Sequence, residues 1–240
     1  MTRLTVTEKD YNQSNILYVQ STMSELFSHA DCSVSVTVEN GRAKLNINCP
    51  EYYQDIVKAE LADKLAEIIA IKYKYDYFKK SISVGGLSKT EIEILLASLI
   101  AADLDDDKKY AFERLKKCGE HNALDGIFNF RLQPLKNKWK DIAQYIPFGF
   151  VNSQLKEFIS YLIENKRKRV LIDSGKVYDS HYRRLTRSSL LDGDNVKIVR
   201  EVLLSNCGEV ELYGVLPKDD EYYLKEFYSD KIIFANNYRS

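Results

Sequence analysis

Residues 122–132 read Asn-Ala-Leu-Asp-Gly-Ile-Phe-Asn-Phe-Arg-Leu and lie at the middle of a chain of 240 residues. Asn122 is a preferred N-cap residue, and Asp125 would then stand at N3, where a carboxylate favours the positive end of a helix. Apolar side chains cover almost every side of the predicted helix, so it should lie between other elements; they are Ile127, Phe128, Phe130, Leu132 and Leu135. Pro134 lacks a backbone N–H and clashes with the preceding turn, which predicts a kink or an end near Leu132.

Arg131 is the exception on this apolar helix. A guanidinium there must reach outward to water or find a carboxylate, because an unpaired buried charge is costly. Two interpretations stay open. Arg131 could form a structural ion pair, or it could be a point of anion recognition.

The composition bounds the class of protein. Hydrophobic residues make up 45% and charged residues 29%, which is typical of a soluble globular protein. Thirty-five basic residues balance thirty-five acidic ones, so the charge of the whole molecule gives no argument for nucleic acid. No signal-peptide pattern opens the chain, and the longest apolar run, Ile92 to Ala102, is too short to span a bilayer. The sequence therefore predicts a cytoplasmic protein without a transmembrane segment.

A β-hairpin is the clearest local signal. Apolar and polar residues alternate on both sides of Asn40-Gly41, which predicts a two-residue type I′ turn with one buried face; the apolar positions are Val34, Val36, Val38, Ala43, Leu45 and Ile47. The same register places Cys32 opposite Cys49, within disulfide range. These cysteines are interpreted as small buried side chains in a reducing compartment, with a metal site of His29, Cys32 and Cys49 as a weak candidate. No cofactor is predicted.

Alternating helical and strand patterns predict an α+β fold. Residues 1–84 should form an N-terminal α/β unit with the hairpin, and residues 85–165 should form a central helical region, or bundle. Residues 166–240 form a C-terminal α/β unit with a small mixed sheet, and the whole could be one compact domain. Within it, Ser174-Gly175 should turn a second hairpin, Gly208 should close a helix, and Ile232 to Phe234 should be a last, buried strand.

Four acids at Asp103, Asp105, Asp106 and Asp107 form one acidic cluster. Such a cluster could bind a hard cation. Acidic residues also favour the first turn of a helix, because the helix dipole is positive there. The cluster is therefore interpreted as the start of a helix.

The strongest charge asymmetry lies between residues 166 and 187. Basic side chains outnumber Asp173 and Asp179 there; they are Lys166, Arg167, Lys168, Arg169, Lys176, Arg183, Arg184 and Arg187. On a hairpin, such residues could contact a phosphate backbone or an anionic membrane surface. The alternative is a solvated face without a function in binding.

Residues 124–132, Leu-Asp-Gly-Ile-Phe-Asn-Phe-Arg-Leu, resemble the L-x-G-F-I-x-F-R-L core of the YtxC-like family of sporulation proteins. Residues 154–163, Gln-Leu-Lys-Glu-Phe-Ile-Ser-Tyr-Leu-Ile, are similar to the E-F-I-x-L-L segment of that family. The closing order of strand, helix and strand is also similar, so the resemblance covers roughly the second half of the chain. Pro134 departs from the family pattern. The resemblance implies a role in sporulation and does not imply a reaction.

No catalytic arrangement can be found in the sequence, because His29, His121 and His181 lie far apart without a motif around them. The leading hypothesis is a non-enzymatic interaction or scaffold protein of sporulation with a protein partner. The alternative is nucleic-acid or anionic membrane-surface binding through residues 166–187. A third hypothesis is an enzyme whose site assembles from distant residues, with a deep pocket lined by Arg131.

Overall fold

The structure is a computed structural model and describes residues 1–234. Their contacts group into two compact units. The first contains Met1–Lys74 and Asp105–Lys140, and the second contains Tyr75–Leu104 and the chain from Asp141 onward. Both units combine helices with a sheet, which confirms the α+β class. The division into residues 1–84, 85–165 and 166–240 that we expect from the sequence stays a prediction. Among the described residues, no helix combines the length and the apolar character needed to cross a membrane.

The first unit contains a four-stranded sheet in the order β2-β3-β1-β4. Its strands are β1 (Thr2–Lys9), β2 (Ser33–Glu39), β3 (Arg42–Cys49) and β4 (His121–Ala123). The predicted hairpin is confirmed in its register, with Val38 opposite Ala43 and Val34 opposite Ile47. Positive φ angles at both turn residues, 51° at Asn40 and 71° at Gly41, are those of a type I′ turn.

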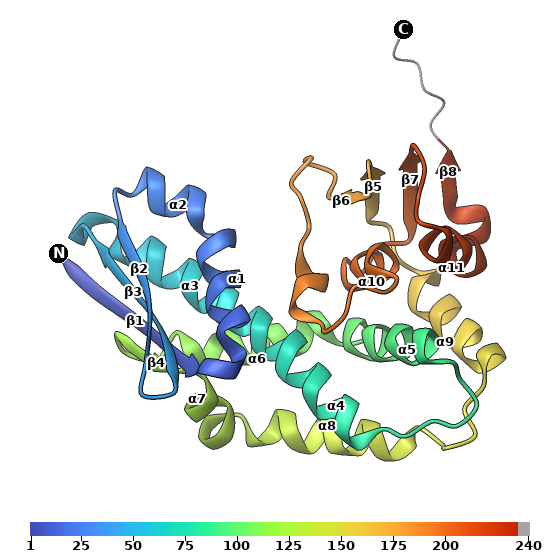
Figure 1. Cartoon of the computed structure of the whole chain (residues 1–240), viewed down its shortest axis with the longest axis horizontal. Helices are drawn as coiled ribbons and strands as arrows, with labels where there is room; N and C mark the ends of the chain where they lie inside the picture. Colours follow the sequence, from blue (N-terminus) through green and yellow to red (C-terminus); the bar gives the residue numbers. More distant parts are fainter. Residues whose placement is uncertain (235–240) are drawn as a thin grey trace, which may run out of the picture. The chain divides into compact units, whose positions relative to one another are not determined.

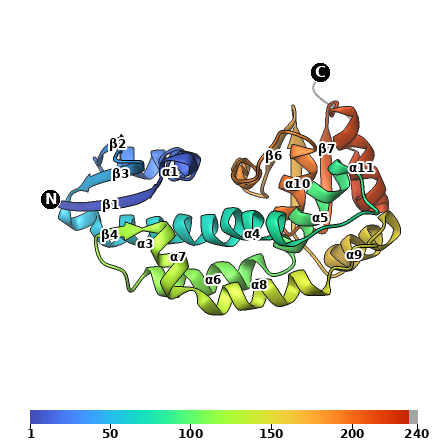
Figure 2. The same cartoon turned by 60° about the horizontal axis from the view of Figure 1, so that its bottom comes forward.

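Helices cover this sheet, and Figure 2 shows α3 running beneath the strands. The helices of the first unit are α1 (Gln13–Thr22), α2 (Ser24–His29), α3 (Gln54–Ile68), α6 (Leu104–Leu115), α7 (Leu124–Arg131) and most of α8 (Gln133–Tyr145). Short 3-10 turns at Asp10–Asn12 and Glu51–Tyr53 precede α1 and α3. A π-helical segment, Ile69–Tyr73, joins α3 to α4 (Lys74–Ser81). The acidic cluster overlaps the first turn of α6, as predicted.

Residues 122–132, which we call the central stretch, differ from their prediction at both ends of the helix. Asn122 is not the N-cap, because it belongs to β4 and pairs with Val6, and α7 begins only at Leu124. Parallel pairing with β1 keeps the backbone extended through Ala123 and so delays the helix. The expectation that this helix lies between other elements is wrong for the side of Phe130, whose side chain is 84% exposed. The expected effect of Pro134 is confirmed, since α7 ends at Arg131 and a new helix begins at Gln133.

The second unit contains a four-stranded sheet in the order β6-β5-β7-β8. Its strands are β5 (Arg169–Asp173), β6 (Lys176–Tyr178), β7 (Glu209–Tyr213) and β8 (Ile232–Phe234). Figure 1 shows α10 and α11 beside this sheet. The helices that lie wholly in this unit are α5 (Lys89–Ala101), α9 (Asn152–Glu164), α10 (Lys197–Leu204) and α11 (Lys218–Tyr228), with 3-10 turns at Arg187–Leu190 and Ser229–Lys231.

Three predictions for the second unit have different outcomes. The hairpin turn at Ser174-Gly175 is confirmed, with φ angles of 50° and 73°. The last strand is not buried: Phe234 is 60% exposed, because β8 stands at the sheet edge and pairs on one side with β7. Gly208 does not close α10. That helix ends at Leu204, and Asn206 takes the left-handed conformation at its end.

Candidate functional site

Three of the predicted basic residues contact carboxylates or a carbonyl oxygen of the same unit. Arg169 lies 2.8 Å from Glu209 and 3.8 Å from Glu211, both on the neighbouring strand β7. The side chain of Arg183 pairs with Asp179 at 2.8 Å. Arg187 is half-buried, and its Nη1 donates to the carbonyl oxygen of Leu204 at 3.0 Å. These contacts give all three residues a structural role in the second unit.

The remaining basic residues of this segment form a group that we call the free cationic set. Within residues 1–234 their side chains make no ion pair; they are Lys166, Arg167, Lys168, Lys176 and Arg184. All except the half-buried Lys166 are exposed. Backbone contacts fix their places, because Arg184 bridges to Tyr178 at the end of β6 and the carbonyl oxygen of Lys168 accepts from Gly208.

Two members of the set, Lys176 and Arg184, line a cavity of about 460 Å³ in the second unit. Hydroxyl groups share the lining with them, from Ser174, Thr186, Ser188 and Ser189. Lys197 at the start of α10 adds a third cation, which pairs at 3.5 Å with Asp194 of the same lining. Guanidinium, ammonium and hydroxyl groups are the side-chain groups that proteins use to contact phosphate.

Two buried carboxylates stand at the same cavity. Glu201 accepts hydrogen bonds from the backbone N–H groups of Arg187 and Ser188, at 3.0 and 2.6 Å. Asp220 accepts from the backbone N–H groups of Ile198 and Val199, at 2.9 and 3.0 Å, and so caps the first turn of α10. Burial raises the pKa of both carboxyls, although these hydrogen bonds oppose the shift. Their lone pairs are used by the backbone, so we assign both a structural role.

Arg131 lies in the first unit, exposed at the end of α7. Its Nη1 contacts the sulfur atom of Cys118 at 3.3 Å. Within the described residues, Arg131 makes no ion pair to a carboxylate, and it lines neither the cavity of about 460 Å³ in the second unit nor a cavity of about 200 Å³ in the first. Arg131 therefore belongs to a different unit from the other basic candidates.

A polar cluster that the sequence reading missed surrounds the start of the central stretch. Arg42 donates to both carboxylate oxygens of Asp125, at 2.6 and 3.3 Å. Nearby, the hydroxyl of Tyr73 donates to the buried Glu8 at 2.5 Å, and the ring of Tyr73 packs on Phe128 with centroids 4.6 Å apart. Burial and the Glu8 carboxylate raise the pKa of Tyr73. The alternation of β1 was a usable signal, because it places Glu8 on the same buried face as Leu4 and Val6.

A double-mutant cycle tests the Arg42–Asp125 pair. The hydrogen bond from Arg42 lowers the pKa of Asp125, and we expect a coupling free energy of about 0.5–1 kcal/mol, since both side chains are partly exposed. Urea unfolding of Arg42→Ala, Asp125→Ala and the double variant measures it. A coupling free energy of zero would show that the pair does not connect α7 to the hairpin.

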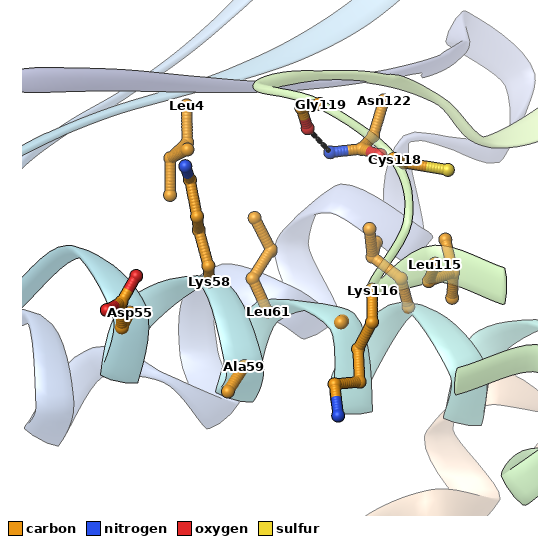
Figure 3. Close-up of a pocket in the computed structure, with 12 residues that line it drawn as sticks. Leu4, Asp55, Lys58, Ala59, Leu61, Leu115, Lys116, Cys118, Gly119 and Asn122 are labelled. Carbon is orange, nitrogen blue, oxygen red and sulfur yellow. Dashed lines mark hydrogen bonds between the residues drawn. The ribbon is translucent and has the colours of Figure 1, made fainter. Parts of the chain in front are cut away.

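The first unit contains a cavity of about 200 Å³, which Figure 3 shows in close-up. Helix α3 supplies Lys58 and Leu61 on one side, and β1 supplies Leu4 from above. The chain between α6 and α7 closes the cavity with Gly119 and Asn122. The amide Nδ2 of Asn122 donates to the carbonyl oxygen of Gly119 at 3.3 Å.

The weak metal candidate is not assembled. Within the described residues, no three His, Cys, Asp or Glu side chains gather as a group that could hold a metal ion. His29 contacts the carbonyl oxygen of Glu25 instead, at 2.8 Å. Cys32 and Cys49 are free thiols whose pKa is raised, chiefly by burial. The thiols of this pair are thus favoured over thiolates.

Comparisons with known proteins assign no family to the chain. No family model matches it, and no curated protein matches it. Among solved structures, it is similar to a chain described as "Predicted insulinase family protease from Yersinia pestis", with 11% identity over 95% of the present chain and 42% of that one. The present chain thus spans less than half of that protein. The TM-score of this match is 0.23.

Proposed function

We propose that this chain is an interaction protein of sporulation that catalyses no reaction of its own and binds an anionic surface of a protein partner. The resemblance of residues 124–132 to the YtxC-like core supports the process. The observation that supports the binding mode is the free cationic set, whose side chains form no ion pair with a carboxylate of residues 1–234.

The contrast within one short segment strengthens this proposal. Arg169 and Arg183 are neutralised by neighbouring carboxylates, whereas Arg167 and Arg184 form no ion pair in the described part of the chain. Exposed cations without a neighbouring carboxylate attract an acidic partner and raise its association rate. Specificity then comes from which cations are free, rather than from the net charge of zero.

Nucleic acid or an anionic membrane surface is the second candidate partner. It is favoured by the cavity where Arg184 and Lys176 lie with serine and threonine hydroxyls, since this combination suits phosphate oxygens. The same cations would serve either partner. The difference is that a phosphate ligand would also use the hydroxyls.

A salt titration tests the second candidate directly. A fluorescent DNA duplex and vesicles containing phosphatidylglycerol are each titrated with the protein between 50 and about 200 mM KCl. If phosphates are bound by four members of the set, the logarithm of the binding constant should fall with the logarithm of salt with a slope of about −3.6. Binding that ignores salt, or no binding to either probe at 50 mM KCl, rejects phosphate recognition and leaves the acidic protein partner.

A further inference from the structure

The cavity of Figure 3 combines an apolar wall with a small number of polar groups. Its wall is built from side chains of β1, α3 and α6 that are themselves almost fully buried; they are Leu4, Leu61, Ala62, Leu65 and Leu115. Apolar cavities of about 150 Å³ hold a molecule as large as benzene. A cavity of about 200 Å³ therefore has room for a short aliphatic side chain and the polar group attached to it.

Asn122 leaves a hydrogen-bond acceptor unused at this cavity. The residue is only 8% exposed, and its Oδ1 has no hydrogen-bond partner in the described residues. A buried acceptor without a donor costs about 1–3 kcal/mol, so a native protein retains one for a reason. One bond of 3.3 Å to Gly119 holds the amide, and χ2 of asparagine is a soft torsion. A rotation about χ2 that gives up this bond would turn Oδ1 toward a donor in the cavity that Asn122 lines.

Charges of both signs stand at the mouth of the cavity. Lys58 projects from α3 toward β1 in Figure 3, and its ammonium lies 3.9 Å from Glu120 in a loose contact. Asp55 lies one helical turn earlier and adds a carboxylate to the same lining. A ligand with a carboxylate alone would be repelled by Asp55, and a ligand with an ammonium alone would be repelled by Lys58. Lys116, just after α6, is a second cation of the lining, and Glu120 is a second anion beside Lys58, so the charges around the mouth balance and favour a ligand of zero net charge.

We propose that this cavity binds a small zwitterion with an aliphatic side chain, that is, an apolar α-amino acid. The carboxylate of the ligand pairs with Lys58, its ammonium donates to Asn122 Oδ1, and its side chain packs on Leu61 and Leu65. The proposal is independent of the free cationic set, which belongs to the second unit. It gives the start of the central stretch a function in ligand binding.

The test uses the full chain labelled with ¹⁵N and ¹³C and three ligands of one shape. Leucine has both charges, 4-methylpentanoate lacks the ammonium, and 3-methylbutylamine lacks the carboxylate. We expect leucine to shift the side-chain amide signals of Asn122 and the methyl signals of Leu61 in a saturable way. Each analogue should bind at least about tenfold more weakly, because one hydrogen-bonded charge is missing.

Two variants confine the binding to this cavity. Ala59 is an exposed residue of the lining, so Ala59→Phe should fill the mouth without disturbing the core and should abolish the leucine shifts. Ala102→Phe, at an exposed alanine of the second unit, is the matched control and should leave them unchanged. Leucine shifts that survive Ala59→Phe overturn the proposal. Equal binding of leucine and either analogue, or no saturable leucine shift in the wild-type chain, also overturns it.

Discussion

Replacing Asp107 with alanine should lower the free energy of unfolding by about 3–5 kcal/mol. The Asp107 carboxylate is 1% exposed and accepts three hydrogen bonds from two other helices. Lys74 and Trp139 donate to Oδ2 at 2.9 and 2.8 Å, and Lys138 donates to Oδ1 at 2.6 Å. Lys74 is itself fully buried, so the loss of this carboxylate leaves a buried ammonium with less compensation. Urea unfolding followed by circular dichroism measures the change.

The neighbouring acid supplies the control for that experiment. Asp106 is exposed in the same turn of α6, and Asp106→Ala should change the free energy of unfolding by less than about 0.5 kcal/mol. The double variant Asp107→Ala, Lys74→Met should recover part of the loss, because it also removes the buried ammonium. Equal effects of Asp106→Ala and Asp107→Ala would contradict the structural role of this carboxylate.

The ionisation of Asp107 should make the free energy of unfolding depend on pH in the acidic range. Burial opposes ionisation of Asp107, but Lys74, Lys138 and Trp139 outweigh burial and hold its pKa below the usual 3.8. A folded-state pKa below the unfolded one contributes stability that is present above about pH 4 and is lost as the pH falls through the folded value. The difference in free energy of unfolding between wild-type protein and Asp107→Ala should therefore become smaller as the pH falls below about 4.

Replacing Gly208 with alanine should cost about 3 kcal/mol, at the upper end of overpacking effects. A Cβ atom there would lie 2.0 Å from the carbonyl oxygen of Lys166 and 2.8 Å from its carbonyl carbon. Both are backbone atoms, so no side-chain rotation can relieve the clash. The backbone N–H of Gly208 also donates to the carbonyl oxygen of Lys168 at 2.9 Å, which ties the start of β7 to the start of β5. Thermal unfolding should show a lower melting temperature.

Gly119→Ala is the matched control, since a Cβ atom at Gly119 meets no atom within 4 Å. We expect a change of less than about 0.5 kcal/mol, because alanine narrows the unfolded ensemble slightly without a clash. A stable Gly208→Ala variant would show that residues 166 and 208 do not approach as closely as the structure has them.

The sequence was sufficient to predict elements that are determined by residues close together in the chain. The hairpin around Asn40-Gly41 was predictable from a short pattern, and the structure confirms it. The break before Pro134 is equally local, because it follows from a missing N–H and a clash with one turn.

Distant contacts decided what could not be predicted. Asn122 has the side chain of an N-cap, but pairing with β1 makes it a strand residue. Asp107 carried the same first-turn signal as Asp105 and Asp106, and only the packing of α6 against Lys74 and Trp139 singles it out. No spacing in the sequence encodes which strand or helix will arrive beside a residue.

The same reason divides the predicted basic residues. Arg169 and Arg167 are indistinguishable in a run of four basic residues, yet the parallel pairing of β5 with β7 brings Glu209 to Arg169. The sequence therefore identified the basic segment, but only the fold shows which charges remain available to a partner.

The central claim is that the free cationic set binds an anionic partner, and one comparison tests it most directly. Wild-type protein and two variants are immobilised and exposed to an extract of sporulating cells. One variant changes four free cations to glutamine, Arg167, Lys168, Lys176 and Arg184; the other changes two paired ones, Arg169 and Arg183. The claim predicts that wild-type protein captures a partner protein that added salt releases. The variant with four changes should lose this partner, and the variant with two changes should retain it. Wild-type protein should still retain the partner after nuclease and detergent treatment. Equal capture by wild-type protein and the first variant would contradict it.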